Sequence, residues 1–288
     1  MQASAPAFDR DFPLIAGMAD RVSERVIRVL APNPSAYTFT GTVSYIVGAQ
    51  DVTVIDPGPA DEAHLEALMA ALDGRRVAHI LVTHSHRDHY PLATRLKELT
   101  GAPVCGFGAD AHFTPDRLIA DGQILSGPDY TLTGLHTPGH MWNHLCLRLA
   151  EENALFSGDH VMTWSTSIVA PPEGDMAHFM ASLRKVMALK PTVLYPGHGP
   201  QKYAPQGFLR ALLTHRRLRE AAILGQVQAG LSELQAITRA VYAGLAPELF
   251  PGACLSAQAH LEHLAAKGQI ILKTAASGAA LYLPRAIA

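Results

Sequence analysis

The sequence predicts an α/β protein in which mixed sheets are covered by helices, followed by a smaller helical module. Short β-branched runs alternate with amphipathic stretches of helical period through the first part of the chain. Beyond about residue 204 long helical stretches replace the strands, until a last pair of short strands. With 48% hydrophobic and 17% charged residues, the composition is that of a compact globular protein and excludes coiled coil, collagen and general disorder.

The first elements are predicted from residue type and spacing. Residues 42–48 and 52–56 are β-branched runs joined by a short turn, which predicts an antiparallel hairpin. A helix is expected from the N-cap candidate Asp61 to about Gly74, because leucines recur there with helical spacing. The other elements expected in this part are strands at 79–83, 102–106, 131–136, 144–149, 153–156 and 192–195, and a helix at 175–189.

The C-terminal part has the pattern of a winged helix. Its predicted helices span 208–228, 231–242 and 255–267. Two strands, at 269–273 and 280–283, flank a turn that contains glycine, and helices followed by a terminal hairpin are typical of a winged-helix module. We therefore expect a larger α/β domain over residues 1–205 and a winged-helix-like domain over residues 206–288.

Charge and cysteine content limit the possible partners and locations. The chain has 23 Lys and Arg against 25 Asp and Glu, so its net charge of −2 provides no general attraction for nucleic acid. Its three cysteines are odd in number and widely spaced, which argues against a disulfide framework. With no signal segment and no apolar run long enough to cross a bilayer, we expect a cytoplasmic protein without a membrane partner.

Fifteen histidines are present, and several of them stand in one motif. Directly after the strand that ends at Val82, the order His-x-His-x-Asp-His places His84, His86, Asp88 and His89 on a single loop. Imidazole combined with carboxylate favours zinc-class metals over magnesium or calcium, and the spacing suits two ions. The alternative, a polar surface loop, rarely carries this pattern behind an apolar strand.

Three further candidate ligands follow strand-like stretches. Each comes directly after a glycine: His140 in Thr-Pro-Gly-His, Asp159 in Ser-Gly-Asp and His198 in Tyr-Pro-Gly-His. Glycine lets the backbone turn sharply, so each side chain can reach the edge of a sheet. The order His, Asp, His strengthens the prediction of a metal centre.

With these motifs the sequence resembles the metallo-beta-lactamase superfamily over roughly residues 20 to 200. The resemblance implies an αββα sandwich with a dinuclear metal centre. Carried over position by position, it implies one metal held by His84, His86 and His140, a second held by Asp88, His89 and His198, and Asp159 as the bridge.

The resemblance also implies a metal-dependent hydrolase. Two zinc ions would share a water, lower its pKa from about 15.7 toward about 7, and let the bridging hydroxide attack the substrate. Asp88 and Asp159 would be the catalytic residues, because they would fix the metal geometry and the orientation of the hydroxide. Manganese and iron also accept nitrogen and oxygen ligands. His86 favours zinc hydrolysis, because the redox-active di-iron relatives have a glutamate at that place.

Longer segments, some of them around the candidate ligands, are similar to the beta-lactamase-like group with a C-terminal winged helix. Among them are Ser157-Gly-Asp-His-Val-Met-Thr-Trp-Ser-Thr166 and Tyr195-Pro-Gly-His-Gly-Pro200. That group includes a mitochondrial endoribonuclease and fungal acyl-carrier thioesterases. The chain departs from the wider superfamily at Tyr90, followed by proline, where small residues are common, and this would reshape the mouth of the pocket. The candidates for the substrate pocket are Tyr90, His160, Trp164 and Ser165, with packing as the alternative for the tryptophan.

Three functions remain open. We rank a small ester, thioester or lactone above single-stranded RNA as substrate, because the net charge is negative. The rival from another class is a non-catalytic nucleic-acid-binding regulator. Its candidate DNA-reading helix, 255–267, contains one Lys, whereas binding to phosphates needs several Lys or Arg on one face. We therefore favour a packing, substrate-lid or dimer role for this module, and a homo-oligomer is possible. Arginines between 210 and 219 are candidates for an anionic substrate, with helix-surface charge as the alternative.

Overall fold

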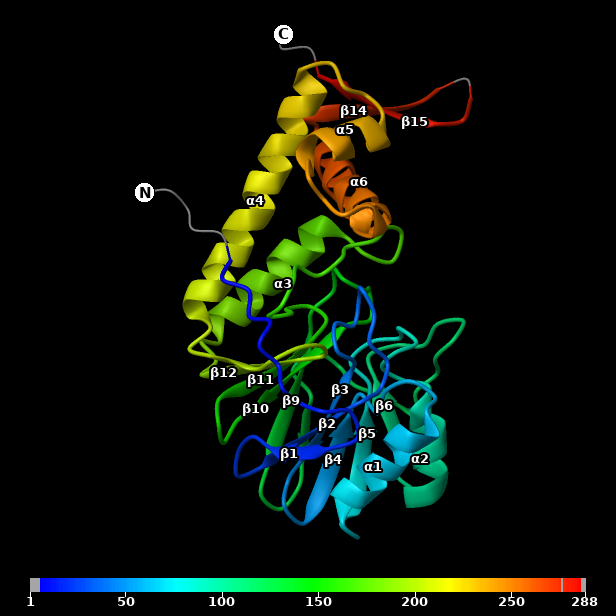
Figure 1. Ribbon diagram of the computed structural model, residues 1–288, viewed down its shortest axis with the longest axis vertical. Coiled ribbons are helices and arrows are strands. Elements are labelled where there is room, and N and C mark those ends of the chain that lie inside the picture. Colours follow the sequence, from blue (N-terminus) through cyan, green and yellow to red (C-terminus); the bar gives the residue numbers. More distant parts are fainter. Residues whose placement is uncertain (1–5, 276, 286–288) are drawn as a thin grey trace.

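The computed structural model describes residues 6–275 and 277–285. Two sheets pack face to face, helices cover the outer face of each, and the C-terminal helices and a two-stranded ribbon lie at one end of the sandwich (Figure 1). The αββα arrangement implied by the sequence is therefore confirmed.

The first sheet has seven strands in sequence order. They are β1 (Ala19–Arg21), β2 (Val26–Leu30), β3 (Val43–Val47), β4 (Asp51–Ile55), β5 (Arg76–Leu81), β6 (Val104–Gly106) and β7 (Arg117–Leu118). The expected hairpin is β3–β4, whereas β4, β5 and β6 run parallel. Parallel neighbours need crossover connections. Two such crossovers are the helices α1 (Glu62–Leu72) and α2 (Leu92–Thr100), which pack on the outer face.

The second sheet has six strands in the order β13-β12-β11-β10-β9-β8. They are β8 (Ile124–Ser126), β9 (Thr131–His136), β10 (Leu145–Leu149), β11 (Ala154–Gly158), β12 (Val193–Pro196) and β13 (Lys202–Tyr203). The helix α3 (Met176–Ala188) connects the parallel pair β11 and β12 and packs on the outer face of this sheet. Its N-cap is Asp175, whose carboxylate accepts a hydrogen bond from the backbone N–H of His178.

The inner faces of the two sheets share one apolar core. Tyr45 from the first sheet contacts Phe156 and Tyr195 from the second, with ring centroids 5.0 Å and 5.6 Å away. The hydroxyl of Tyr45 donates to the carbonyl oxygen of Pro196, 2.8 Å away, so even this buried polar group is satisfied. The core therefore fixes the two sheets relative to each other at the edge where the candidate ligands lie.

The structure contains short elements that the sequence did not predict. They are β1, β2, α2, β7, β8 and β13. The run of β2 is interrupted by Arg28, whose charge is paired across the strands with Asp20 of β1 at 2.7 Å. The helix α2 has nine residues and no side-chain cap at Pro91. Such elements are stabilised by tertiary contacts more than by local preference.

The C-terminal module is built on one long helix. It contains α4 (Gln206–Gln228), α5 (Leu234–Val241), the 3-10 turn η1 (Pro247–Leu249), α6 (Phe250–Ala266), β14 (Ile270–Thr274) and β15 (Ala280–Pro284). The first half of α4 packs beside α3 through Phe208 and Leu212, and its second half enters a separate core through Ile223 and Val227. Figure 1 shows α4 running from the α3 layer to the ribbon. The proposed division at residue 205 stays a prediction, because α4 contributes to both cores.

No helix in the two described ranges is both long enough and apolar enough to cross a bilayer.

Glu220 connects α4 to α6. Its carboxylate accepts hydrogen bonds from Nδ1 of His263 at 2.7 Å, Nδ1 of His260 at 3.4 Å and Nζ of Lys267 at 3.1 Å. Burial alone would raise the pKa of Glu220, but these hydrogen bonds outweigh it and lower the pKa to about 2. The ionised carboxylate therefore stabilises this part of the fold.

We predict that Glu220→Gln lowers the free energy of unfolding by about 1–2 kcal/mol at pH 6. Because the folded pKa lies below the ordinary value of 4.5, the contribution is complete above that value and is lost as the pH falls toward 2. Urea unfolding of both proteins between pH 6 and pH 3 should show the difference shrinking with acid. Glu262→Gln, at an exposed site of α6, is the control. A difference that is independent of pH would contradict the assignment.

Candidate metal centre

The histidine motif forms the loop between β5 and α2. The strand β5 is buried at its C-terminal end, and the loop that follows it holds His84, His86, Asp88 and His89. His84 and His89 are buried, His86 is half-buried, and Asp88 keeps 26% of its side chain exposed. A loop at the carboxyl end of a buried strand thus directs four candidate ligands to the same edge of the sandwich.

The other three candidate ligands reach the same place from the second sheet. His140 follows β9, Asp159 follows β11 and His198 follows β12. The glycines before them are required by the space. A Cβ at Gly139, whose φ is +136°, would lie 2.3 Å from the backbone of Phe179, and one at Gly197 would lie 2.7 Å from Oδ1 of Asp159. The structure therefore brings all seven candidate ligands together.

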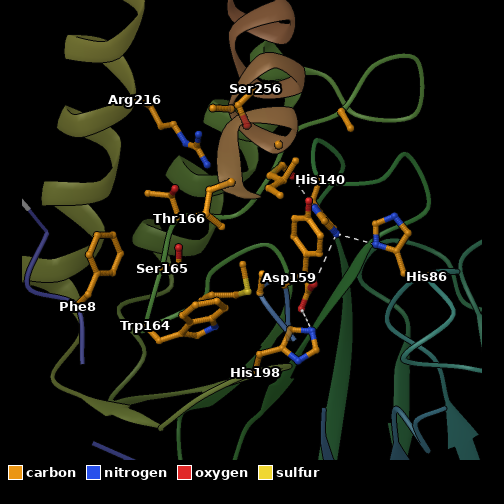
Figure 2. A pocket seen from close by; sticks show the side chains of 18 of the residues that line it. Phe8, His86, His140, Asp159, Trp164, Ser165, Thr166, His198, Arg216 and Ser256 are labelled. Atoms are coloured by element: carbon orange, nitrogen blue, oxygen red, sulfur yellow. Dashed lines mark hydrogen bonds and ion pairs between the residues drawn. The ribbon is translucent and has the colours of Figure 1, made fainter. Parts of the chain in front are cut away.

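One group consists of His84, His86, His140 and Asp159, whose ligand atoms lie within 4.8 Å of one another. Nδ1 of His86 is 3.0 Å from Nε2 of His84 and 3.0 Å from Nε2 of His140. Oδ2 of Asp159 is 3.7 Å from Nε2 of His140 (Figure 2). Four donors converge at this point from both sheets.

The second group consists of Asp88, His89 and His198. Oδ2 of Asp88 lies 3.1 Å from Nε2 of His198 and 3.4 Å from Nε2 of His89. Oδ1 of Asp159 lies 3.3 Å from Nε2 of His198 and 3.6 Å from Nε2 of His89. Asp159 therefore presents one carboxylate oxygen to each group, which is the placement that a bridging ligand needs.

These donors suit a pair of divalent ions. A tetrahedral zinc ion with metal–nitrogen distances of about 2.0–2.1 Å holds its ligand atoms roughly 3.3–3.5 Å apart, close to the separations within both groups. Nε2 of His89 and Oδ1 of Asp159 are buried and make no hydrogen bond with the described residues. Burying such atoms without a partner is unfavourable, and a bound cation would satisfy both.

Hydrogen bonds on the outer nitrogen atoms orient three of the rings. Nδ1 of His89 donates to Oδ2 of Asp56 at 2.9 Å. Nδ1 of His140 donates to the carbonyl of Ile168 at 2.6 Å, and Nδ1 of His198 to the carbonyl of Gly41 at 3.2 Å. A ring that donates from Nδ1 keeps the lone pair of Nε2 free, and in all three rings Nε2 faces the cluster.

The sequence analysis missed two supporting residues. Asp56 also accepts hydrogen bonds from the backbone N–H and the hydroxyl of Thr83, both at 2.7 Å, so it fixes the start of the histidine loop between β5 and α2. Nε2 of His144 accepts from the backbone N–H groups of Asp159 and His160 at 3.1 and 3.2 Å and so shapes the Asp159 loop. Asp56 follows the buried strand β4, and this signal, shared with the ligands, could have identified it.

The electrostatics of the cluster favour a cation. Burial lowers the pKa of His84, and it lowers the pKa of His86 to about 4, so both rings are neutral at pH 7. Burial also opposes a charge on His198, but the carboxylates of Asp159 and Asp88 outweigh it and raise its pKa to about 9. The carboxylates therefore generate a negative potential that draws positive charge to the second group.

A cavity of about 470 Å³ opens beside the cluster. His86, Asp88, His140, Asp159 and His198 line its base. Helices α4 and α6 form the opposite wall, as Figure 2 shows through Arg216 and Ser256. The C-terminal module thus supplies part of the surface that a bound molecule would contact.

The four pocket candidates from the sequence lie in different places. Trp164 and Ser165 line the cavity, and Trp164 stacks on Phe39 with ring centroids 4.9 Å apart. Tyr90 is not among the described residues that line it, because its ring packs against Phe113 under the first sheet. His160 is fully buried with its ring against Phe179, and it borders a small separate hollow instead of the cavity.

Two family models match the chain. The model described as the metallo-beta-lactamase superfamily matches residues 37–198. The model described as the beta-lactamase associated winged helix domain matches residues 234–276, which contain α5, α6 and β14. Both predicted parts of the architecture therefore have a counterpart among known families.

Relatives extend this similarity over nearly the whole chain. An atrochrysone carboxyl ACP thioesterase from Aspergillus fumigatus is 36% identical over 220 residues, which cover 73% of this chain and 67% of the relative. The beta-lactamase-like protein 2 homolog of Drosophila melanogaster is 32% identical over 274 residues, covering 87% and 91%. A beta-lactamase domain protein from Burkholderia ambifaria shares the fold, with a TM-score of 0.83, 21% identity and 96% of each chain covered. The chain spans 57 to 67% of the length of the matched thioesterases.

We predict that Asp159→Ala loses metal and activity together, with metal binding at least about 100-fold weaker, because the substitution removes an oxygen from each group. Elemental analysis of the purified wild type should show up to two zinc-class ions per chain. Asp11→Ala, at an exposed site, should retain them. Full metal content or full activity in Asp159→Ala would refute the bridging role.

We further predict that Asp56→Asn weakens metal binding by about 10–100-fold. His89 and Thr83 together use both carboxylate oxygens of Asp56, whereas the side-chain amide of asparagine has only one oxygen that can accept a hydrogen bond. A competition titration against a chromophoric zinc chelator measures this change. Asp73→Asn is a matched control, since Asp56 and Asp73 both have a φ of +48° and Asp73 is exposed. Equal weakening in the two variants would point to the backbone and not to the hydrogen bonds.

Proposed function

Because this chain belongs to the metallo-beta-lactamase superfamily, we propose that it is a metal-dependent hydrolase that cleaves a small acyl substrate, a thioester in the first place. The observation that carries the proposal is the convergence of seven donor side chains, five of which line a cavity. We propose as metal ligands His84, His86, Asp88, His89, His140, Asp159 and His198.

Zinc is the metal that we propose for both groups. Five imidazoles and two carboxylates are a nitrogen-rich set that suits zinc better than magnesium or calcium. A histidine at position 86 favours hydrolysis over the redox chemistry of di-iron relatives. Two bound zinc ions would lower the pKa of a shared water, so that a hydroxide is available near neutral pH, and would polarise the substrate carbonyl.

The two carboxylates of the cluster have different surroundings. Asp159 is almost fully enclosed by histidines, so we assign it the role of fixing the geometry. Asp88 also lines the cavity and keeps 26% of its side chain exposed. We therefore assign to Asp88 the roles of orienting the attacking water and accepting its proton.

The cavity supports an acyl substrate. Met141, Met162 and Ile168 provide apolar surface in the cavity beside the cluster, and Trp164 and Ser165 also line it. A volume of about 470 Å³ is in the range of small-molecule sites. A fungal relative is named as an ACP thioesterase, which supports the proposal that the substrate of this chain carries an acyl group.

The positions of α6 residues weigh against the rival functions. Gly252, Ala253 and Ser256, near the start of this helix, line the cavity. In helix-turn-helix modules that bind DNA, the N-terminal residues of the recognition helix contact the base edges in the major groove. A cavity of about 470 Å³ also suits a small molecule better than an RNA chain. We therefore favour a wall of the substrate pocket as the role of the module.

We predict that the zinc-loaded protein hydrolyses acyl thioesters, and that Asp88→Asn lowers kcat by about 100-fold or more, since proton transfer by a placed side chain contributes about 10²–10⁴-fold. Release of the free thiol from a panel of acyl-pantetheines measures the activity. A fluorescent single-stranded RNA is assayed in parallel. Turnover of RNA alone would overturn the ranking of substrates. Chelator-resistant, salt-dependent DNA binding without any hydrolysis would favour the regulator.

A further inference from the structure

Two arginines of α4 line the cavity without an acidic partner. The side chain of Arg216 is almost fully buried, lies 4.8 Å from the ring centroid of Phe179, and donates a hydrogen bond from Nη2 to the carbonyl of Ser167. Arg219 lies 4.0 Å from the ring centroid of Tyr242 and donates from Nη1 to the carbonyl of Val241 at 2.7 Å. Neither forms a salt bridge with an acidic side chain in the described ranges.

Arg216 keeps its charge despite burial. Burial lowers the pKa of Arg216 to about 10, so the guanidinium remains charged at neutral pH. Burial and the neighbouring charges of Arg216 and Arg219 lower the pKa of His215 to about 4, which leaves this imidazole neutral. A buried guanidinium that contacts only a backbone carbonyl and an aromatic ring is unfavourable, and an anion bound in the cavity would compensate its charge.

The two guanidinium groups lie where one ligand can reach both. Residues three apart on a helix share a face, and both arginines line the cavity. Figure 2 shows Arg216 extending from α4 toward Thr166, on the side away from His86 in this view. Outside the metal cluster, Glu173 is the carboxylate among the described cavity-lining residues, and it is exposed.

We propose that Arg216 and Arg219 bind an anionic group of the substrate, a carboxylate or a phosphate, while the bond to be hydrolysed lies at the metal cluster. This inference rests on the proposed hydrolase function and specifies the substrate class. Planar guanidinium groups bind both anions through paired N–H donors. The anion has two possible sources in a thioester: a carboxylate on the acyl chain or a phosphate on the thiol portion.

The test compares two pairs of thioesters, and each pair differs in one charged group. Glutaryl-pantetheine is paired with its neutral glutaramoyl analogue, and butyryl-4′-phosphopantetheine with butyryl-pantetheine. The ratio of kcat/KM within each pair is measured for the wild type, Arg216→Met, Arg219→Gln and the control Arg217→Gln. Arg217 is on the same helix but exposed. Thermal unfolding identifies any variant that does not fold, and Arg219→Gln keeps the test open if Arg216→Met fails.

We expect the charged member of one pair to be preferred by at least about tenfold in the wild type, mainly through a lower KM. That preference should fall toward one in Arg219→Gln and remain in Arg217→Gln. The pair that shows it identifies the source of the anion. A ratio near one for both pairs in an active enzyme, or a preference that survives in both arginine variants, would overturn the proposal.

Failure of the hydrolase function is recognised separately. If none of the four compounds is cleaved, calorimetric titration of the same compounds still tests the arginines. The charged members should then bind the wild type at least about tenfold more tightly than Arg219→Gln. Equal binding to both proteins would overturn the inference, as would binding of single-stranded RNA that depends on the same arginines.

Discussion

The carboxylate of Asp56 is the constraint on which the metal cluster depends. Asp56 directly follows β4 and accepts hydrogen bonds from Thr83 and His89. The end of β4 therefore holds the histidine loop, which follows the neighbouring parallel strand β5. The second sheet has a comparable support in His144, whose Nε2 accepts from the backbone of the Asp159 loop. Each sheet thus fixes its own candidate ligands, and the shared core between the sheets brings the two sets together.

Burial controls which histidines are neutral and which attract positive charge. The rings of His64 and His160 are buried and form no ion pair with a carboxylate of the described residues, and burial lowers their pKa values to about 4 and about 3. His198 is buried as deeply, yet two carboxylates raise its pKa to about 9. The number of histidines in a sequence therefore says little about a metal site. What distinguishes the cluster is the placement of Asp88 and Asp159 among the imidazoles.

The candidate ligands named from the sequence lie together in the structure, and the signals that mark them are local. A short motif after a buried strand, and a glycine before each later ligand, mark positions where the backbone must turn at the sheet edge. The surroundings of neighbouring residues were harder to predict. Tyr90 follows His89 directly, yet its ring packs against Phe113 on the outer face of the first sheet. His160 follows Asp159, but its ring is buried against Phe179 of α3. Adjacency in sequence does not tell which side of the backbone a side chain takes.

The far wall of the cavity could not be predicted, because it depends on how α4 is oriented. Nothing in the pattern of this helix specifies which arginines point inward, and sequence charge alone gives Arg216 and Arg217 equal weight. Packing separates them: Phe208 and Leu212 fix one half of α4 beside α3, and Ile223 fixes the other half in the C-terminal core. A straight helix of 23 residues is about 35 Å long, so these two anchors determine the rotation of the turns between them. The wall is therefore set by the same contacts that join the two cores, and the winged helix contributes to the site by holding α4 in place.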